Sequence, residues 1–589
     1  MKNIIWLYKP YIKYGKILVI LSIFFWLVLI PLNSILPIYF PQKIIDALES
    51  GNSFGEIIKI TVFFSSILCF IPMYEDVFNM YYKNKTTEKI ELNIKCDIYS
   101  QALKTDYKYI DDPKYYDDYV WALNEYANQS SEAHNLILNF IATLVTVTTI
   151  IGIVITTSPW LVILIILNIG LRMLTYFQTD KILLAKDEKI IPFDRKLNYF
   201  HRIFYLNNYA ADLKSTNLKS YILAGYDENK NRKLAAIGKA GHKAVWWSLI
   251  SDVIYRLSMA LITLLIAYEI YNGRIATVGM YITLMLAVDK LDEHLFRFSD
   301  LIRSGKKISM YGGRIRKFFE LESEIENESK NTDKISAEPN VFSVEFKDVK
   351  FRYDNSDFSI TDFSLKINPG EKIAIVGENG AGKSTLVKLL LRLYDVTQGD
   401  ILINSISIKK YDVHSLRKLI GVSFQSPNIY ALSLIDNIEL YNKSDDENSL
   451  RKLLHNLGIN KIMEKNTANL STEMTKEFDE NGIVLSGGET QKVGLARIFN
   501  GDFGLILLDE PSSALDPIAE YEMNNLILSE NNKSTTIIIA HRLSTVRYAD
   551  KIILVDSGTI KENGTHDELM AAKGQYYNMF TKQAENYVE

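Results

Sequence analysis

The stretch Gly377-Glu-Asn-Gly-Ala-Gly-Lys-Ser-Thr385 decides the fold of the C-terminal half of this chain. It follows the apolar run Ile373–Val376 and precedes the helix-compatible segment Leu386–Leu393. Glycines at this spacing let backbone amides close around phosphate oxygens, and the following helix points its N-terminus at the same anion. The pattern therefore predicts a strand, a phosphate-binding loop and a helix, in that order.

A second apolar run ends in two acids. Leu505–Leu508 is followed directly by Asp509 and Glu510. A carboxylate at this place can support Mg²⁺ held by Ser384, and its neighbour can accept a proton from a water that attacks a terminal phosphate. Lys383 is expected to contact the outer phosphates. Together these residues predict that a nucleoside triphosphate is bound and hydrolysed.

Further short apolar runs alternate with helical stretches around these motifs. Alternating patterns begin at Val341, and the expected strands lie at 372–376, 419–424, 505–508, 536–540 and 551–555. This alternation predicts an α/β domain with a largely parallel sheet.

The N-terminal half is much more apolar, up to about Leu301. A membrane-spanning helix needs about 20 mainly apolar residues. We expect six spans, at Ile17–Phe40, Ile57–Tyr81, Leu136–Thr157, Trp160–Phe177, Trp247–Tyr271 and Ala276–Leu301. A large soluble helical bundle is the alternative, but several of these runs carry almost no charge along their whole length, which favours a lipid bilayer as surroundings.

Lysines indicate the orientation of these spans. They precede the first span and follow the second, at Lys2, Lys9, Lys13, Lys16, Lys83, Lys85, Lys89 and Lys95. Positive residues favour the cytoplasmic side, so we expect the N-terminus and the C-terminal half in the cytoplasm. The long inner stretches 82–133 and 178–245 are compatible with helices. Within them, Asp111–Tyr119 and Ala210–Tyr221 are either contacts for a cytoplasmic domain or ordinary turns between helices.

Several ionisable residues fall inside the expected spans, where they are costly and usually face a cavity or a partner. Asp289 lies near the middle of the sixth span. We hypothesise that Asp289, together with Glu75 of the second span, lines a path for a substrate that bears positive charge. The alternative is an ion pair within the protein, or a position already below the bilayer.

The composition changes after Phe319, where 321–340 is polar and without apolar periodicity. We therefore expect a transmembrane domain at 1–320, a linker at 321–340 and a nucleotide-binding domain at 341–589. The formal net charge of -4 gives no sign of a nucleic-acid partner.

A third motif, Leu485-Ser-Gly-Gly-Glu489 with Gln491 following, places a serine and two glycines ahead of a helix, which makes another amide-rich anion cradle. At this point the sequence resembles the ATP-binding cassette (ABC) transporters, and the resemblance covers nearly the whole chain. The third motif is similar to the family's signature. It carries Glu489 where glutamine is commoner, a variant that we expect to be tolerated.

Five more positions match family motifs in the expected order. The resemblance implies that Tyr353 stacks on adenine and that Gln425 links the metal site to the membrane domain. Glu480 resembles the acid that touches a coupling helix. Asp516 matches the loop that crosses to a partner subunit. His541 matches the histidine that senses the γ-phosphate, and it also ends an apolar strand that follows the two carboxylates.

The resemblance implies ATP and Mg²⁺ as ligands. The expected catalytic residues are Lys383, Glu510 and His541. The expected Mg²⁺ ligands are Ser384, Gln425 and Asp509. The residues expected to contact ATP are Tyr353, Gly377, Glu378, Asn379, Gly380, Ala381, Gly382, Lys383, Ser384, Thr385, Gln425, Ser486, Gly487, Gly488, Glu489 and Asp516.

Six spans followed by one cassette resemble an exporter half-transporter: an α-helical six-span domain with long cytoplasmic extensions, fused to an α/β P-loop ATPase. The resemblance implies that two chains assemble, as a homodimer or with a related half-transporter. Each ATP then lies between the phosphate loop of one chain and Ser486–Gly488 of the other, and closure drives alternating access. Because Glu510 is retained, a homodimer is favoured.

The cargo is less determined. Asp111-Asp-Pro-Lys-Tyr-Tyr116 and the segments Leu485–Phe499 and Leu508–Glu520 are similar to bacterial peptide and lantibiotic exporters. This similarity favours export of a ribosomally made peptide. A multidrug or lipid exporter that carries an amphipathic small molecule is the rival, and a membrane-anchored regulatory ATPase that transports nothing is a third reading. A composition rich in Lys, Ile and Asn suggests a Gram-positive bacterium and its plasma membrane.

Overall fold

The computed structural model describes residues 1–157, 159–272, 277–325, 335–338, 341–353, 358–443, 446–465, 467–515, 517–528 and 533–585. The chain divides into two compact units. One contains Met1–Leu103 and Lys114–Leu321, and the other contains Lys104–Pro113 and Glu322–Glu589. The short segment Lys104–Pro113 therefore belongs to the C-terminal unit although it lies early in the sequence.

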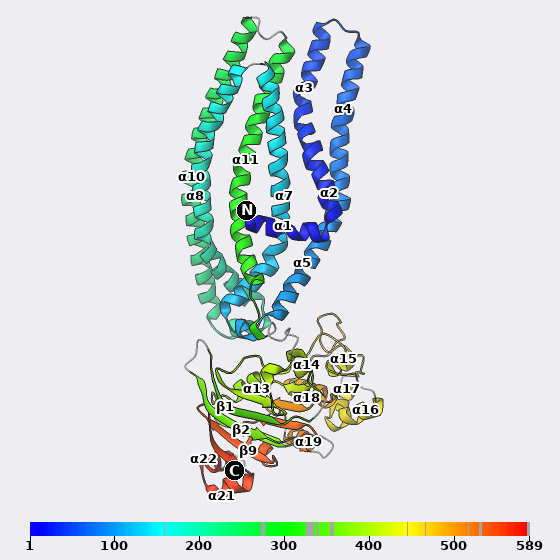
Figure 1. Cartoon of the computed structure of the whole chain (residues 1–589), viewed down its shortest axis with the longest axis vertical. Helices are drawn as coiled ribbons and strands as arrows, with labels where there is room; N and C mark the ends of the chain where they lie inside the picture. The colour runs from blue at the N-terminus through cyan, green and yellow to red at the C-terminus, as the bar shows by residue number, and fades with distance from the viewer. Residues whose placement is uncertain are drawn as a thin grey trace. The chain divides into compact units, whose positions relative to one another are not determined.

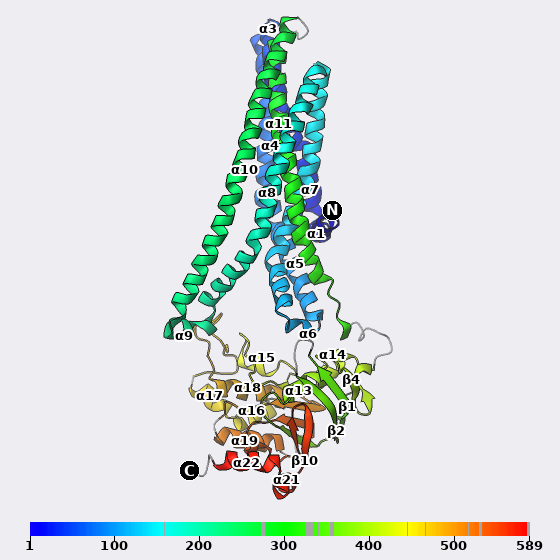
Figure 2. The ribbon, with the colours of Figure 1, turned by 90° about the vertical axis from the view of Figure 1, so that its left-hand side faces the viewer.

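The N-terminal unit is built from long helices (Figure 1). Their bounds are α1 Lys2–Tyr14, α2 Lys16–Phe24, α3 Ile30–Glu49, α4 Phe54–Val77, α5 Asn84–Lys104, α7 Pro113–Thr157, α8 Pro159–Tyr205, α9 Asn207–Ser215, α10 Leu218–Tyr271 and α11 Val278–Phe319. Two π-helical segments, Phe25–Leu29 and Phe78–Lys83, join α2 to α3 and α4 to α5. Figure 2 shows α8 and α10 running side by side into the α9 turn.

Apolar side chains in this unit lie on both the inside and the outside of the helices. Ile38 of α3, Val154 of α7, Ile266 of α10 and Leu284 of α11 form a buried cluster. Other large apolar residues are exposed, among them Phe63, Leu174 and Leu264. An exposed apolar surface along long helices is suited to lipid, because backbone polar groups are already satisfied within each helix.

Among the described residues, four helical stretches are long and apolar enough to cross a membrane: Lys16–Glu49, Phe54–Lys104, Lys114–Ile155 and Leu218–Tyr271. They correspond to four of the six expected spans. The expected span at Trp160–Phe177 lies within α8 and adjoins residue 158, which is outside the description. The described part of the expected span at Ala276–Leu301 lies mainly in α11 and carries the four charges Asp289, Lys290, Asp292 and Glu293.

The C-terminal unit has two sheets. A six-stranded sheet has the order β10-β9-β3-β8-β7-β6, and a four-stranded antiparallel sheet has the order β2-β1-β4-β5. The strands are β1 Val344–Arg352, β2 Ser359–Ile367, β3 Lys372–Val376, β4 Gln398–Ile403, β5 Ile406–Ser407, β6 Ile420–Ser423, β7 Leu505–Asp509, β8 Thr535–Ile539, β9 Lys551–Asp556 and β10 Thr559–Gly564. Strands β9, β3, β8, β7 and β6 are parallel, and only β10 pairs antiparallel. The expected parallel sheet is thus confirmed, while the antiparallel sheet was not anticipated.

Both faces of the parallel sheet are buried, which explains the continuous apolar runs in its strands. Ile373 and Ile375 face the core beneath the antiparallel sheet, whereas Ala374 and Val376 face the core beneath the helices. The helices are α6 Tyr107–Ile110, α13 Lys383–Leu390, α14 Val413–Lys418, α15 Leu434–Ile438, α16 Glu447–Asn456, α17 Ile459–Lys465, α18 Gly487–Phe499, α19 Pro517–Leu528, α20 Leu543–Val546, α21 His566–Ala572 and α22 Gln575–Glu585.

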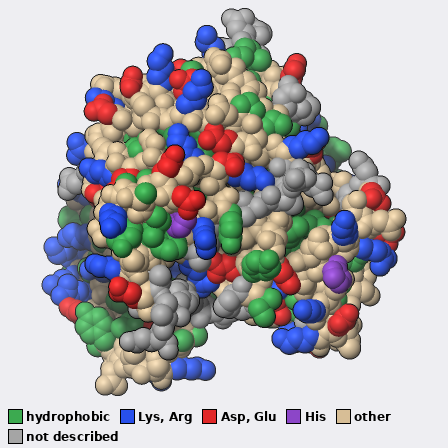
Figure 3. All heavy atoms as spheres, turned by 90° about the horizontal axis from the view of Figure 1, so that it is seen from below, with side chains coloured by type: hydrophobic (Ala, Val, Ile, Leu, Met, Phe, Trp, Pro, Cys, Tyr) green, Lys and Arg blue, Asp and Glu red, His purple; other side chains and the backbone are tan. Residues whose placement is uncertain are grey.

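The surface of the C-terminal unit differs in kind from that of the long helices. The face drawn in Figure 3 mixes Lys and Arg with Asp and Glu side chains, and apolar side chains are scattered between them. Mixed charge of this kind suits water rather than lipid.

Candidate functional site

The phosphate loop joins β3 to α13, and two of its glycines are required by close neighbours. A Cβ on Gly377, whose φ is +151°, would lie 2.0 Å from the backbone oxygen of Val555. A Cβ on Gly382, whose φ is +103°, would lie 2.6 Å from the ring of Phe358. Any side chain at these positions would push the loop away from β9 or from Phe358, so the loop shape depends on glycine.

Lys383 opens α13 and turns back over the loop. Its Nζ donates to the backbone oxygens of Gly377 at 2.8 Å and Glu378 at 2.9 Å, and only 5% of the residue is exposed. Burial lowers the pKa of this ammonium group, while the charges of Glu510 and Asp509 act in the opposite direction. A buried cation whose only polar partners are neutral carbonyls is well placed to bind a phosphate anion instead.

A cavity of about 340 Å³ lies beside the phosphate loop. Tyr353, Phe358, Asn379, Gly380, Gly382, Lys383, Ser384, Thr385, Glu510 and His541 line it. The structure thus brings together the phosphate loop, the second carboxylate and the histidine, which lie far apart in the sequence. Tyr353 is at its edge, with its hydroxyl 3.2 Å from the hydroxyl of Thr385.

Asp509, at the end of β7, has the features of a metal ligand. Its side chain is hydrogen-bonded to Ser384, while its Oδ1 is buried and has no hydrogen-bond partner. Burial raises the pKa of Asp509, and the charge of Glu510 raises it further against the hydrogen bond from Ser384. A buried, unsatisfied carboxylate oxygen beside a hydroxyl is the donor set that Mg²⁺ accepts, so these residues fit the metal.

Glu510 is held from two sides. The Nε2 of Gln425 donates to its Oε2 at 2.8 Å, and the Nε2 of His541 lies 2.9 Å from its Oε1. Its φ is +50°, an uncommon conformation for a residue with a side chain, and its backbone amide donates to Ile539 at 2.9 Å. These restraints from β6, β7 and β8 fix the carboxylate at the cavity, where it can act on a water molecule.

The third motif caps a helix. The Ser486 side chain accepts a hydrogen bond from the Glu489 amide, and the Glu489 carboxylate accepts one from the Ser486 amide at 2.8 Å, a capping box at the start of α18. The Ser486 amide also lowers the pKa of Glu489. Among the described residues that line the phosphate-loop cavity, none comes from this motif. The cavity lining of this chain thus does not include the expected ATP contacts Ser486, Gly487, Gly488 and Glu489 among its described residues, and Asp516 lies outside the described residues.

This strand, loop and helix arrangement belongs to a known family. Residues 360–513 match the family model described as ABC transporter. The whole chain is similar to the subtilin transport ATP-binding protein SpaT of Bacillus subtilis, with 29% identity over 603 residues that cover 100% of this chain and 96% of SpaT. Residues 360–513 are thus an ABC transporter ATPase domain, and the chain as a whole is similar to ABC exporter half-transporters.

Other relatives of the exporter agree with this assignment. The putative multidrug export ATP-binding/permease protein YgaD of Bacillus subtilis (strain 168) is 34% identical over 325 residues, which cover 54% of this chain and 53% of YgaD. A solved structure of a bacterial Atm1-family ABC exporter with ATP bound has the same fold, with a TM-score of 0.81 at 22% identity over 96% of this chain and 97% of that one. The exporter is a multi-pass membrane protein whose ATPase is coupled to transport.

Sequence reasoning missed an aromatic cluster behind Tyr353. The Tyr394 hydroxyl donates to the Asp111 carboxylate, and Lys388 of α13 lies 3.6 Å from the same carboxylate. Lys388 also lies over the rings of Tyr353 at 5.8 Å and Tyr107 at 5.2 Å. The segment that carries α6 thus contacts the helix that begins at the phosphate loop. The Asp111 segment was expected either to contact a cytoplasmic domain or to form an ordinary turn between helices, and no sequence pattern indicated Lys388 or Tyr394.

The two acids proposed for the substrate path are not in contact. The exposed Asp289 of α11 accepts a hydrogen bond from the hydroxyl of Tyr255 at 2.9 Å. Glu75 of α4 is also exposed, and the described residues give it no contact with Asp289. The neighbouring Asp292 forms an ion pair with the buried Arg172, whose Nε donates to Ser251 at 3.2 Å. One intramembrane acid is therefore neutralised within the protein, while Asp289 keeps an exposed carboxylate.

Proposed function

We propose that this exporter carries a ribosomally made peptide of the lantibiotic or bacteriocin-like kind. The observation that carries the proposal is the extent of the similarity to SpaT, whose name assigns it to subtilin transport. That similarity runs over 100% of the chain. The similarity to the multidrug relative YgaD covers 54% of the chain, and that to a β-(1→2)glucan exporter of Rhodopseudomonas palustris covers 56%. The similarity to SpaT therefore includes the whole N-terminal half, whereas the other two extend over little more than half of the chain.

A multidrug or lipid exporter remains the second candidate. The identity to YgaD, 34%, is higher than the 29% to SpaT, although it extends over a shorter stretch. An amphipathic small molecule would then be the cargo. A regulatory ATPase that moves nothing is disfavoured by the assignment to an exporter family.

We assign the hydrolytic roles as follows. Lys383 exchanges its two carbonyl partners for phosphate oxygens. Tyr353 stacks on the adenine at the edge of the cavity. Glu510, positioned by Gln425 and His541, accepts a proton from the attacking water. His541, 2.9 Å from that carboxylate, also reaches the γ-phosphate.

Ser384 and Asp509 are the proposed ligands of Mg²⁺, with Gln425 as the third. When bound, Mg²⁺ would neutralise charge on the β- and γ-phosphates. The hydroxyl of Ser384 and the unsatisfied Oδ1 of Asp509 support this proposal. In the structure the Gln425 amide is turned to Glu510, so its carbonyl oxygen is the atom free to bind a cation.

We further propose a homodimer in which Ser486–Gly488 of a second chain complete each ATP site. The absence of this motif from the described residues that line its own chain's phosphate-loop cavity supports the idea. A related half-transporter is the alternative partner. We retain the domain bounds 1–320, 321–340 and 341–589, the cytoplasmic N-terminus and the plasma membrane of a Gram-positive bacterium as parts of the proposal.

The test uses inverted membrane vesicles that contain the full chain and a labelled candidate peptide. ATP should drive uptake of the peptide, and Glu510→Gln should abolish uptake while ATP still binds. General base catalysis contributes about 10² to 10⁴ in rate, so ATPase activity should fall by at least about a hundredfold. Uptake that persists without hydrolysis would contradict the mechanism. ATPase stimulation by drugs or lipids, with none by peptides, would favour the second candidate.

Asp289→Asn tests the proposed path. The change removes the exposed carboxylate but keeps the hydrogen bond from Tyr255 through the amide oxygen. We expect weaker transport of a cationic peptide and unchanged transport of its neutral analogue. Equal transport of both peptides by the variant and the parent would exclude Asp289 from the path.

A further inference from the structure

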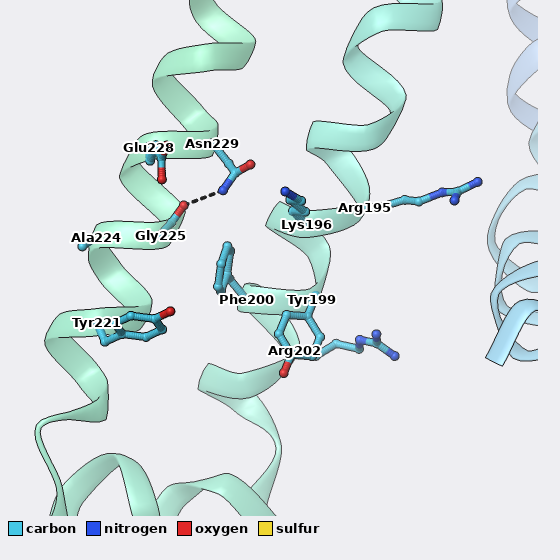
Figure 4. Close-up of a pocket in the computed structure, with 10 residues that line it drawn as sticks. All are labelled: Arg195, Lys196, Tyr199, Phe200, Arg202, Tyr221, Ala224, Gly225, Glu228 and Asn229. Atoms are coloured by element: carbon cyan, nitrogen blue, oxygen red, sulfur yellow. Dashed lines mark hydrogen bonds between the residues drawn. The ribbon is translucent and has the colours of Figure 1, made fainter.

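A large pocket lies between α8 and α10, on the parts of these helices nearest α9 (Figure 4). Its volume is about 650 Å³, within the range of ligand-binding sites. Residues of both helices line it: Arg195, Lys196, Tyr199, Phe200, Arg202, Tyr221, Ala224, Gly225, Glu228 and Asn229. None of them has a role in the site or in the transport path described above.

The pocket has an excess of positive charge. Arg195, Lys196 and Arg202 form no ion pair among the described residues, and Arg202 lies only over aromatic rings, at 6.0 Å from each of two tyrosines. The one acid of the lining, Glu228, is already paired with Arg232 at 2.5 Å. Other charges on the same two helices are paired too, such as Lys233 with Asp194 at 2.5 Å. Three cations in one lining without an ion pair among the described residues favour an anionic ligand.

The pocket also has an aromatic slot. In Figure 4, Phe200 lies in the space between the two helices, and Tyr221 lies against α10 with its hydroxyl directed towards α8. A Cβ on Gly225 would lie 2.9 Å from the ring of Phe200, so glycine lets that ring approach the backbone of α10. The Asn229 amide donates to the Gly225 oxygen at 2.8 Å and stiffens the same turn. Aromatic rings between two helices can stack on an aromatic group of a ligand.

Two of the three cations lie on a different side of α8 from the aromatic rings. In Figure 4 the side chains of Arg195 and Arg202 extend away from α10, whereas Lys196 and Phe200 lie on the side of α8 that faces α10. A ligand that touches both must pass around α8, which a compact anion cannot do. An extended chain with alternating acids and an aromatic group can, so the arrangement favours a peptide segment over a small molecule.

The position along the helix excludes a lipid headgroup. Helix α8 runs unbroken from Pro159 to Tyr205. Arg195 lies about 18 residues beyond Phe177, where the expected fourth span ends, and at about 1.5 Å per residue this is about 27 Å. The ligand must therefore be in water, not in the bilayer.

We propose that this pocket binds an acidic segment of the exported peptide that carries an aromatic side chain, before the peptide enters the membrane domain. The inference rests on the proposed function, because it takes the peptide as cargo. The cations hold the carboxylates, and Phe200 and Tyr221 hold the aromatic ring.

The test measures peptide binding by calorimetry on the full-length exporter in nanodiscs of uncharged lipid. The probe is a synthetic ten-residue peptide with alternating Glu and Ser and one central Phe. Two control peptides replace either all Glu by Gln or the Phe by Ala, and phenyl phosphate serves as the compact aromatic anion. We expect the probe to bind, each control peptide to bind at least about fivefold more weakly, and the Kd to rise with salt.

Variants locate the binding. Arg195→Gln with Arg202→Gln should weaken the probe by about tenfold or more, since each partly exposed ion pair is worth up to about fivefold in affinity. Gly225→Val, which pushes Phe200 aside, should weaken it without changing any charge. The matched control is Lys239→Gln, which removes an exposed cation of α10 outside the lining. Basal ATPase activity should be the same in all variants as in the parent. An unchanged activity shows that the variants are folded.

Three outcomes would overturn the proposal. They are equal binding to the double variant and the parent, an equal loss with Lys239→Gln, and tight binding of phenyl phosphate. Vesicle uptake separates this inference from the proposed function. If the parent takes up peptides and the pocket variants take them up equally well, the role of the pocket is refuted and peptide export is not. Binding at the pocket with no uptake of any peptide would refute peptide export and leave an acidic-peptide site.

Discussion

Glu489 shows how one residue can depart from a family motif without losing its local role. Its carboxylate accepts the Ser486 amide and completes the capping box of α18. A glutamine oxygen could accept the same hydrogen bond, so the two residue types are interchangeable for the helix. Substitutions of Glu489 can therefore test its role in capping α18 separately from any contact with ATP.

We predict that Glu489→Ala loosens the first turn of α18, whereas Glu489→Gln does not. A lost cap costs about 1 kcal/mol, which is about fivefold in a local opening equilibrium. Hydrogen exchange of the first-turn amides should quicken by that factor in the alanine variant only. Because the Ser486 amide lowers the pKa of Glu489, the carboxylate's contribution is present above its ordinary pKa and is lost as pH falls through the lowered one. An unchanged exchange rate in the alanine variant at neutral pH would contradict the capping role.

Asp509 carries a second prediction at this scale. Its pKa is raised, so it binds a proton at a higher pH than an ordinary aspartate. For the free protein, stability therefore falls as pH rises from the ordinary to the raised pKa, because the folded state then holds the carboxylate charged at a cost. Mg²⁺ needs that carboxylate charged.

We therefore expect Mg²⁺-dependent ATP affinity to fall as pH drops through the raised pKa of Asp509. The measurement is a calorimetric titration of ATP, with and without Mg²⁺, from pH 5 to 8. Asp509→Asn is the control, and it should show low affinity with little pH dependence. The same pH profile in the asparagine variant would assign the effect to another group.

At the scale of elements, α6 and α13 are connected by the cluster of Asp111, Lys388 and Tyr394. Burial raises the pKa of Tyr394, and the hydrogen bond to Asp111 raises it further, so the phenol stays protonated and can keep donating. Lys388 lies on α13, one turn beyond the end of the phosphate loop, and over Tyr353. A shift of Tyr353 on binding adenine would therefore be felt at Asp111 through direct contacts.

We predict that Tyr394→Phe weakens the link between ATP hydrolysis and transport. Basal ATPase activity should stay within about twofold, because the hydroxyl is not part of the cavity lining. A hydrogen bond to a charged group is worth about 1.5 to 3 kcal/mol when buried and less when exposed, so we expect transport per ATP to fall several-fold. Asp111→Asn should have a similar effect, and the double variant should be no worse than either. Additive losses would show that the two residues act separately.

At the scale of the whole molecule, each chain has one phosphate loop and one signature motif, and the two do not meet among the described residues lining the cavity. If each ATP site combines parts of two chains, a chain that lacks Lys383 and a chain that lacks Ser486 should complement each other. The mixed dimer then contains one intact site and one site with both defects.

We predict that mixing Lys383→Met with Ser486→Arg restores ATPase activity, although neither variant is active alone. Random pairing gives mixed dimers in about half of the molecules, each with one good site, so about a quarter of the parent activity should return. Mixing Lys383→Met with itself in two differently tagged forms is the control. No recovery in the mixture would mean that both parts act within one chain.

Sequence alone determined the elements whose signals are local. The glycines at 377 and 382, the lysine after them and the apolar run before them define a strand, a loop and a helix over a few residues, and the structure has all three. The parallel strands were recognisable because both of their faces are buried, which leaves continuous apolar runs. The antiparallel sheet was missed, since its strands alternate only partly and β1 pairs with register shifts on both sides.

Tertiary structure decided which distant side chains meet. Gln425, Glu510 and His541 each follow a strand by one or two residues, but only the order β8-β7-β6 brings two of them within 3 Å of the third. The sequence also did not indicate which residues pair with the charges in the expected spans. A span that is apolar on every side does not reveal which face meets protein, so the pairing of Arg172 with Asp292 follows from packing and not from spacing. Motifs of a few neighbouring residues can be recognised in the sequence. Contacts between distant segments depend on strand order and side-chain packing, which only the folded structure determines.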